Sequence, residues 1–222
     1  MATMTSKLQI INQALAAAEP VTEPDSPLPV LEQFIYGICR EDATPEQAQE
    51  AYENLRAQFF DWNEVRVSST SEIEEALEGL SDAERRAERI ISFLQEVFET
   101  DFSFDLEKIH KKGLKQGAGM LTHFEASSDF VAAWVVQRTL GGHAIPVDAM
   151  TARQCVRLGL VDDDGDLKTV RATLEHLVPK AKGAGFTDAV SVLAGQAEEF
   201  GEPEPAEEAA TPTRRVAKVK PR

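Results

Sequence analysis

Signals for the start of an α-helix recur along most of this 222-residue sequence, whereas the polar–apolar alternation of a β-strand is almost absent. Thr44 and Pro45 supply a cap and a first-turn proline ahead of a segment with helical spacing. Two further segments, Ser71–Glu74 and Ser81–Glu84, have the pattern of a capping box, in which a serine precedes a glutamate by three residues. These signals predict an all-α fold.

The spacing of apolar residues and the positions of prolines predict the other helices. With 42% hydrophobic residues, the chain can bury one good core or two small ones. About nine or ten helices joined by short loops are expected, which indicates an all-α domain larger than a simple four-helix bundle. Besides the three helix starts above, helices are expected over 6–18, after the proline-rich stretch Pro20–Pro29, and over 104–116, 128–139, 149–158 (behind Asp148), 167–178 and 187–200.

Composition divides the chain into three regions. Residues 1–28 hold one helix and a proline-rich linker, and residues 29–200 hold the helical domain. From Gly201 the sequence has few bulky hydrophobic residues and places an acidic block before a basic one, which is typical of a disordered charged tail over 201–222. The basic residues of this tail either contact phosphates or only increase solubility: Arg214, Arg215, Lys218, Lys220 and Arg222.

The two cysteines, Cys39 and Cys155, lie within apolar helical patterns. Neither has the neighbouring cysteines or histidines that a zinc site or an iron–sulfur cluster needs. We therefore expect reduced thiols, no metal, no cofactor and a cytoplasmic location. The first 19 residues match the pattern of a signal peptide only weakly. No run approaches the ~18 apolar residues of a membrane span, so no membrane association is expected.

The charge of the chain is uneven. Lys and Arg number 23 and Asp and Glu number 38, which gives a net charge of −15. Residues 1–100 hold 20 acidic and 7 basic residues, whereas residues 101–190 hold 12 and 11. This excess of acidic residues argues against a protein whose whole surface binds nucleic acid, and any anionic ligand is expected to meet the second half. The acidic first half leaves open a protein partner that the sequence does not identify.

Three segments occur in the order and spacing of a known family, and a fourth, Gly79–Ile90, has a similar pattern. Ala144–Arg157 places Val147 and Asp148 after an apolar pair and before a helix that ends in arginine. Asp129–Gly142, Val170–Pro179 and Gly79–Ile90 supply three further helices. Together they resemble the helix-hairpin-helix DNA glycosylases of the endonuclease III type over about residues 30–200. The resemblance implies a two-lobed all-α fold, in which Asp148 and the loop 124–128 face one cleft.

The hairpin departs from the family pattern. The family's hairpin reads Leu-Pro-Gly-Val-Gly-Arg-Lys, and its glycines let backbone N–H groups approach a phosphate. Here the corresponding residues are Phe124–Phe130, which include no glycine. Phe130 takes the position of the family's Schiff-base lysine, so lyase chemistry is not expected. The four-cysteine cluster found in many members is also absent, so no iron–sulfur cluster is expected.

Asp148 is the candidate catalytic residue. A glycosylase without a lysine nucleophile needs a carboxylate near the anomeric carbon, to activate water or to stabilise positive charge as the base departs. Asp148 is also placed to cap the helix over 149–158, which requires no chemistry. Both roles are compatible, because the family's aspartate also precedes a helix.

Two clusters are candidates for DNA contact. Lys108, Lys111, Lys112 and Lys115 lie directly before the degenerate hairpin, and Ser127 and Ser128 offer hydroxyl groups at a helix start. The alternative for the lysines is a solvated helix face, and Asp129 would repel a phosphate at the serines. A calcium site at Asp162–Asp166 is not expected, because the EF-hand glutamate is missing and Asp166 is placed to cap a helix. Trp62 and Trp134 are expected in the core.

Three functions follow from these observations. The first is a base-excision-repair protein that hydrolyses an N-glycosidic bond with Asp148 and has no lyase activity. The second is a catalytically inactive relative that keeps the helical fold to bind DNA or protein. The third is a helical adaptor unrelated to DNA, which accounts most simply for the acidic first half.

Overall fold

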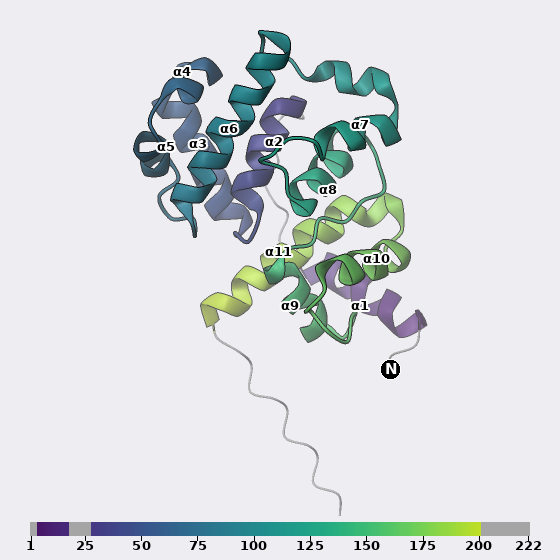
Figure 1. Cartoon of the computed structure of the whole chain (residues 1–222). Helices are drawn as coiled ribbons and strands as arrows, with labels where there is room; N and C mark the ends of the chain where they lie inside the picture. Colours follow the sequence, from purple (N-terminus) through teal and green to yellow (C-terminus); the bar gives the residue numbers. More distant parts are fainter. Residues whose placement is uncertain (1–3, 18–27, 201–222) are drawn as a thin grey trace, which may run out of the picture.

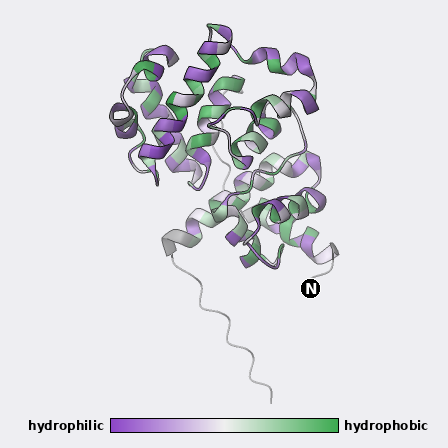
Figure 2. Ribbon diagram, in the orientation of Figure 1, coloured by the Kyte–Doolittle hydropathy of each residue, from purple (hydrophilic) through white to green (hydrophobic). Residues whose placement is uncertain are grey.

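The computed structural model describes residues 4–17 and 28–200, and within these ranges every regular element is a helix. The helices form two groups in space (Figure 1), each with its own hydrophobic core. Most helices carry hydrophobic residues on one side and hydrophilic residues on the other (Figure 2). The all-α fold predicted from the sequence is therefore confirmed, whereas the tail over 201–222 and the proline-rich linker lie outside the described residues.

The first lobe is built around α2 (Val30–Arg40), whose Phe34 ring stacks on that of Phe93 with a centroid distance of 3.9 Å. Helix α2 packs against α3, α6 and α8, and α6 also packs against α4 and α5. The remaining helices of this lobe are α3 (Pro45–Gln58), α4 (Trp62–Val67), α5 (Thr70–Ala76), α6 (Ala83–Asp101), the 3-10 helix η1 (Glu107–Lys112), α7 (Leu114–Leu121) and α8 (Asp129–Arg138).

The second lobe combines the first helix with the C-terminal part of the chain. Helix α1 (Met4–Ala17) packs on α11 (Gly183–Phe200), and Ile11 lies buried in the same core as Phe186. Helix α1 therefore belongs to this lobe, although the sequence placed residues 1–28 outside the domain. The other helices here are α9 (Ala149–Arg157), α10 (Leu167–Leu177) and the 3-10 helix η2 (Lys180–Lys182).

Helix α11 joins the lobes by packing against α3 and α8. Gln137 of α8 donates a hydrogen bond from Nε2 to Thr187 Oγ1 at 3.1 Å, and Arg138 forms an ion pair with Asp188. Gly195 lies so close to α3 that an added Cβ would stand 2.8 Å from Thr44 Cγ2. The two lobes are thus in direct contact close to the turn between α2 and α3.

Of the three helix caps predicted from cap patterns, one is confirmed and two are wrong. Thr44 forms the expected capping box with Gln47. The box of α5 uses Ser69 and Glu72 instead of Ser71 and Glu74, because the same serine–glutamate spacing occurs two residues earlier. Helix α6 has no side-chain cap. Its N-cap residue is Asp82, at φ 52°, and the carbonyl and hydroxyl oxygens of Ser81 accept hydrogen bonds from Arg86 instead.

The helix expected over 104–116 is two shorter helices, because Gly113 interrupts it at φ 76°. Helix α11 begins at Gly183 rather than at residue 187, within a glycine-containing segment that has the composition of a loop. Trp62 and Trp134 are buried as expected, and Asp166 caps α10. None of the described helices is long and apolar enough to cross a membrane.

Candidate nucleic-acid interface

The loop between α7 and α8 holds residues 124–128, which the sequence resemblance aligned with the family's hairpin. Ser128 caps α8, since its Oγ accepts a hydrogen bond from the N–H of Val131 at 3.1 Å. The carbonyl oxygen of Ala126 accepts two hydrogen bonds from Arg89 of α6, at 3.1 Å from Nε and 3.0 Å from Nη2. An arginine side chain therefore holds this loop in a chain that lacks the hairpin glycines.

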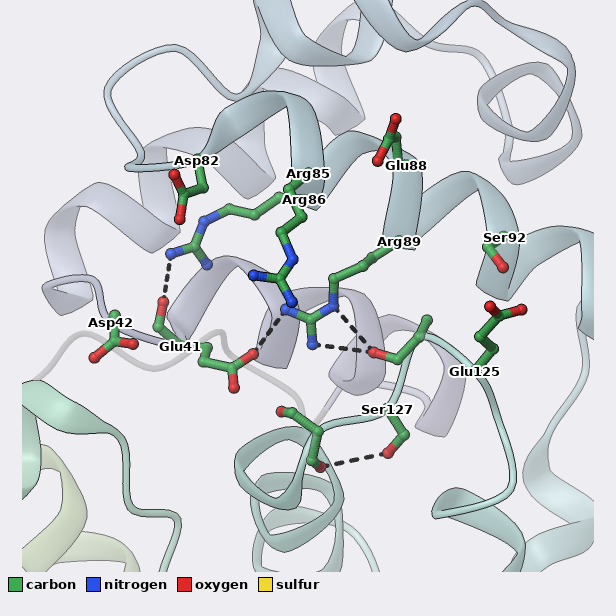
Figure 3. Close-up of a pocket in the computed structure, with 12 residues that line it drawn as sticks. Glu41, Asp42, Asp82, Arg85, Arg86, Glu88, Arg89, Ser92, Glu125 and Ser127 are labelled. Carbon is green, nitrogen blue, oxygen red and sulfur yellow. Dashed lines mark hydrogen bonds and ion pairs between the residues drawn. The ribbon is translucent and has the colours of Figure 1, made fainter. Parts of the chain in front are cut away.

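Arg89 and Arg86 connect three parts of the first lobe. Arg89 also forms an ion pair with Glu41 at 2.8 Å, so one guanidinium joins α6, the end of α2 and the loop (Figure 3). Arg86 is buried and donates to the carbonyl oxygens of Ile38 and Glu41, which the end of α2 leaves without helical partners. Both arginines therefore fix the backbone around one groove.

This groove has a volume of about 450 Å³ and lies between α6, the α2–α3 turn and the loop. Its charged lining consists of three arginines and five carboxylates, so its electrostatic character is mixed. Arg85 is exposed and makes no hydrogen bond or ion pair within the described ranges, which leaves its donors available to an anion. The lining residues are Glu41, Asp42, Asp82, Arg85, Arg86, Glu88, Arg89, Ser92, Glu125, Ala126, Ser127 and Ser128.

Asp148 lies behind the groove rather than on its surface, with 4% of its area exposed. It caps α9 as predicted, because its Oδ1 accepts from the N–H of Thr151 at 2.7 Å. Its Oδ2 accepts from the N–H of Asp42 at 2.8 Å, and Oδ1 of Asp42 accepts from the N–H of Met150 at 3.1 Å. We call this reciprocal pair the Asp42–Asp148 clasp. The loop faces the groove as expected, whereas Asp148 reaches it only through Asp42.

A second cavity of about 390 Å³ lies on the other side of Asp42, between the two lobes. Its lining includes Met150 and Arg153 of α9 and Ser81 before α6. Asp42 lines both cavities and is exposed. The α2–α3 turn therefore places one carboxyl group between the groove and the start of α9.

The predicted lysine cluster lies away from this groove. Lys108 pairs with Asp101, the last residue of α6, while Lys111, Lys112 and Lys115 are exposed. Arg89 and Asp101 are twelve residues apart on one helix, which corresponds to about 18 Å at 1.5 Å per residue. The structure does not bring the lysines together with Ser127 and Ser128. A role of the lysines in DNA binding stays a prediction.

Phe130, which the sequence resemblance placed at the position of the family's lysine, is part of the core. Phe130 is 4% exposed and stacks on Trp134 with a centroid distance of 6.2 Å. The ring has no amine and is enclosed by other side chains, so this position provides no nucleophile.

The cysteines do not fit the iron–sulfur cluster that some relatives carry. Cys39 lies in the core of the first lobe and Cys155 in that of the second, and burial raises the pKa of each thiol to about 12. Such a cluster requires four thiolates that converge on one site, and the sequence holds two cysteines.

The sequence did not single out Asp42, Arg85, Arg86 or Arg89. The run Glu84–Ile90 did contain a signal, because it places three arginines in the first two turns of a helix, where positive charge is unfavourable. Asp42 gave no signal, since its contacts are with residues more than 100 positions away.

The chain matches no model of a protein family and no curated protein. It does match solved structures of DNA glycosylases over most of its length. An endonuclease III–DNA covalent intermediate is 16% identical, with a TM-score of 0.64 over 87% of this chain and 86% of that chain. The H. pylori 3-methyladenine DNA glycosylase MagIII, bound to 1,N6-ethenoadenine, is 13% identical, with a TM-score of 0.65 over 88% of this chain and 98% of that chain.

A Clostridium acetobutylicum 8-oxoguanine glycosylase/lyase, in complex with DNA containing cytosine opposite 8-oxoguanine, is 13% identical. It aligns with a TM-score of 0.65 over 89% of this chain and 71% of that chain. These matches show that the chain has the all-α fold of the helix-hairpin-helix DNA glycosylases, as the resemblance implied.

Proposed function

We propose that this protein binds duplex DNA along the groove and hydrolyses the N-glycosidic bond of an altered base, without a lyase step. The observation that carries the proposal is the placement of Asp148 in the clasp, at the start of α9 and directly behind a groove-lining turn. Its support from other proteins is the shared fold with DNA glycosylases.

Phosphate contacts in this proposal come from the rim of the groove. Arg85 has free donors, and Ser127 and Ser128 supply hydroxyl groups beside it. Arg89 keeps the loop in position through two hydrogen bonds to the carbonyl oxygen of Ala126.

The chemical part of the proposal assigns charge stabilisation to Asp148. Bond cleavage leaves positive charge on the sugar, and a carboxylate in a site shielded from water stabilises such charge strongly. Each oxygen of Asp148 accepts one N–H, so its position is fixed before the reaction begins. Phe130 offers no amine to the sugar, which limits the reaction to hydrolysis.

Base release from defined duplexes tests this proposal. The duplexes carry one uracil, one 8-oxoguanine opposite cytosine, one 1,N6-ethenoadenine or one 7-methylguanine, and alkaline cleavage of the abasic strand reports release. We expect release from at least one duplex, and no covalent adduct after borohydride treatment. Release from none of them overturns the hydrolase, and an efficient borohydride adduct overturns the absence of a lyase step.

Asp148→Asn tests the role of the carboxylate. We expect it to lower the rate of release by about 10²-fold or more, because the amide carries no charge. Asp148→Ser, which also accepts a hydrogen bond at an N-cap, shows whether a loss comes from unfolding when thermal unfolding is measured in parallel. Glu46→Gln removes an exposed carboxylate of α3 that lines neither cavity and should leave release unchanged. Full activity in Asp148→Asn removes Asp148 from the mechanism.

A further inference from the structure

Asp42 is the carboxyl group of the clasp that faces the cavities. Asp148 is buried, whereas Asp42 is exposed and lines both the groove and the second cavity. A group that exchanges protons with a bound base or with water must reach both. Of the two aspartates in the clasp, Asp42 meets this requirement and Asp148 does not.

The backbone of Asp42 is held in an unfavourable conformation. Its φ angle is 50°, in the left-handed region that non-glycine residues adopt rarely. Two hydrogen bonds hold it there, one from its N–H to Asp148 and one from the N–H of Met150 to its Oδ1. Strain that the surroundings maintain in this way is common at functional sites.

We propose that Asp42 is the acid–base residue of the site, which protonates the departing base and then deprotonates the attacking water, while Asp148 stabilises the charge on the sugar. This inference rests on the proposed hydrolysis and adds a second catalytic residue to it.

The step balances without an added reactant. The C1′–N bond breaks, its electron pair stays on the base nitrogen, and that nitrogen takes the proton of the Asp42 carboxyl group. Water then adds to C1′ and gives a proton to the Asp42 carboxylate. The products are the free base with an N–H, a sugar with a hydroxyl group at C1′, and Asp42 in its starting protonated form.

The groups around Asp42 act on its pKa in both directions, and the net shift is upward. Partial burial raises the pKa of Asp42, the charges of Asp148 and Glu41 raise it further, and N–H groups of Met150 and Ala149 lower it. The other charged groups that line the two cavities are Asp82, Arg85, Arg86, Glu88, Arg89, Glu125 and Arg153.

A comparison of neutral and cationic leaving bases separates proton donation from a structural role. A neutral base such as 1,N6-ethenoadenine needs a proton as it leaves, whereas 7-methylguanine already carries positive charge and leaves as a neutral molecule. The variant is Asp42→Asn, because asparagine tolerates positive φ and its Oδ1 still accepts from Met150. Glu46→Gln is the matched control that removes one carboxylate elsewhere.

We expect Asp42→Asn to lower the release of neutral bases by about 10²- to 10⁴-fold and to leave 7-methylguanine release within a few-fold of the unchanged protein. Equal losses on both kinds of base, or no loss on either, overturn the donor role and leave the hydrolase intact. The same holds if the unchanged protein releases 7-methylguanine and no neutral base. Absence of release from every duplex overturns the hydrolase and the role of Asp42 together.

Discussion

The guanidinium group of Arg89 donates two hydrogen bonds to one acceptor, the carbonyl oxygen of Ala126, from Nε at 3.1 Å and Nη2 at 3.0 Å. Its Nη1 contacts the carboxylate of Glu41 at 2.8 Å. A planar group with several fixed donors can serve both partners, whereas an ammonium group offers a single point of charge. The loop before α8 is thus tied to α6 and to the end of α2 through one side chain.

Arg89→Lys therefore tests the geometry of this contact rather than its charge. We expect the free energy of unfolding to fall by about 2 kcal/mol, because lysine cannot reproduce the paired bonds and Ala126 loses its partner. Urea denaturation measures the change. Arg85→Lys is the control on the same helix and should leave stability unchanged, since Arg85 makes no such bonds within the described residues. An unchanged midpoint for Arg89→Lys would contradict this assignment.

Arg85→Ala should affect DNA binding without affecting stability. Loss of one phosphate contact should make the slope of log K against log salt shallower by about 0.9. Fluorescence anisotropy with an abasic-site duplex at several salt concentrations measures it, and Lys180→Ala, exposed in η2, is the charge-matched control. In the same titrations, the combined alanine substitution of Lys111, Lys112 and Lys115 shows whether these lysines, which lie away from the groove, contribute to DNA binding. An unaltered slope for Arg85→Ala would exclude Arg85 from the interface.

Replacement of glycine by alanine is expected to have opposite effects on stability at Gly195 and at Gly119. In Gly195→Ala the new Cβ meets Thr44 Cγ2 at 2.8 Å, so α11 must shift from α3, at a cost of about 1–3 kcal/mol. In Gly119→Ala the new Cβ meets nothing within 4 Å, so alanine should stabilise α7 by roughly 0.5–1 kcal/mol. Thermal unfolding of both variants checks the pair. Equal effects would show that α11 is not in close contact with α3.

Local patterns in the sequence predicted the helix starts that depend on neighbouring residues. Thr44, Ser128, Asp148 and Asp166 each cap a helix through an N–H two or three residues ahead, so the pattern contains both partners. Ser81 failed as a cap because Arg86 occupies it, and Arg86 is placed by its contacts with α2, over 40 residues away.

The groove could not be predicted from the sequence, because it is formed by contacts between residues far apart in the chain. Arg89 reaches Ala126 across 37 residues, and the Asp42–Asp148 clasp spans 106. The family resemblance placed Asp148 correctly at the start of a helix, but its burial follows from the position of the α2–α3 turn. Such long-range pairs become visible only when the packing of the two lobes is known.

The raised pKa of Asp42 gives a prediction for stability against pH. The folded protein holds the proton of the Asp42 carboxyl group more tightly than the unfolded chain does. The folded state therefore binds more protons between two pH values: about 3.9, where an unfolded aspartate titrates, and the higher pKa of folded Asp42. The free energy of unfolding that Asp42 contributes therefore falls as the pH rises through this window. Asparagine does not titrate. Asp42→Asn should consequently be more stable relative to the unchanged protein at pH 7 than at about pH 3, as measured by urea denaturation at both.

Glu72 provides a control of opposite sign. Hydrogen bonds from the backbone and side chain of Ser69 lower the pKa of Glu72, so its contribution to stability is present above the unfolded pKa and is lost as the pH falls through the folded one. Glu72→Gln should therefore be less stable relative to the unchanged protein at pH 7 than at about pH 3. If the two variants shift in the same direction between these pH values, the raised pKa of Asp42 is wrong. Opposite shifts identify the exposed carboxyl group of the clasp as one that retains its proton above the ordinary range for aspartate.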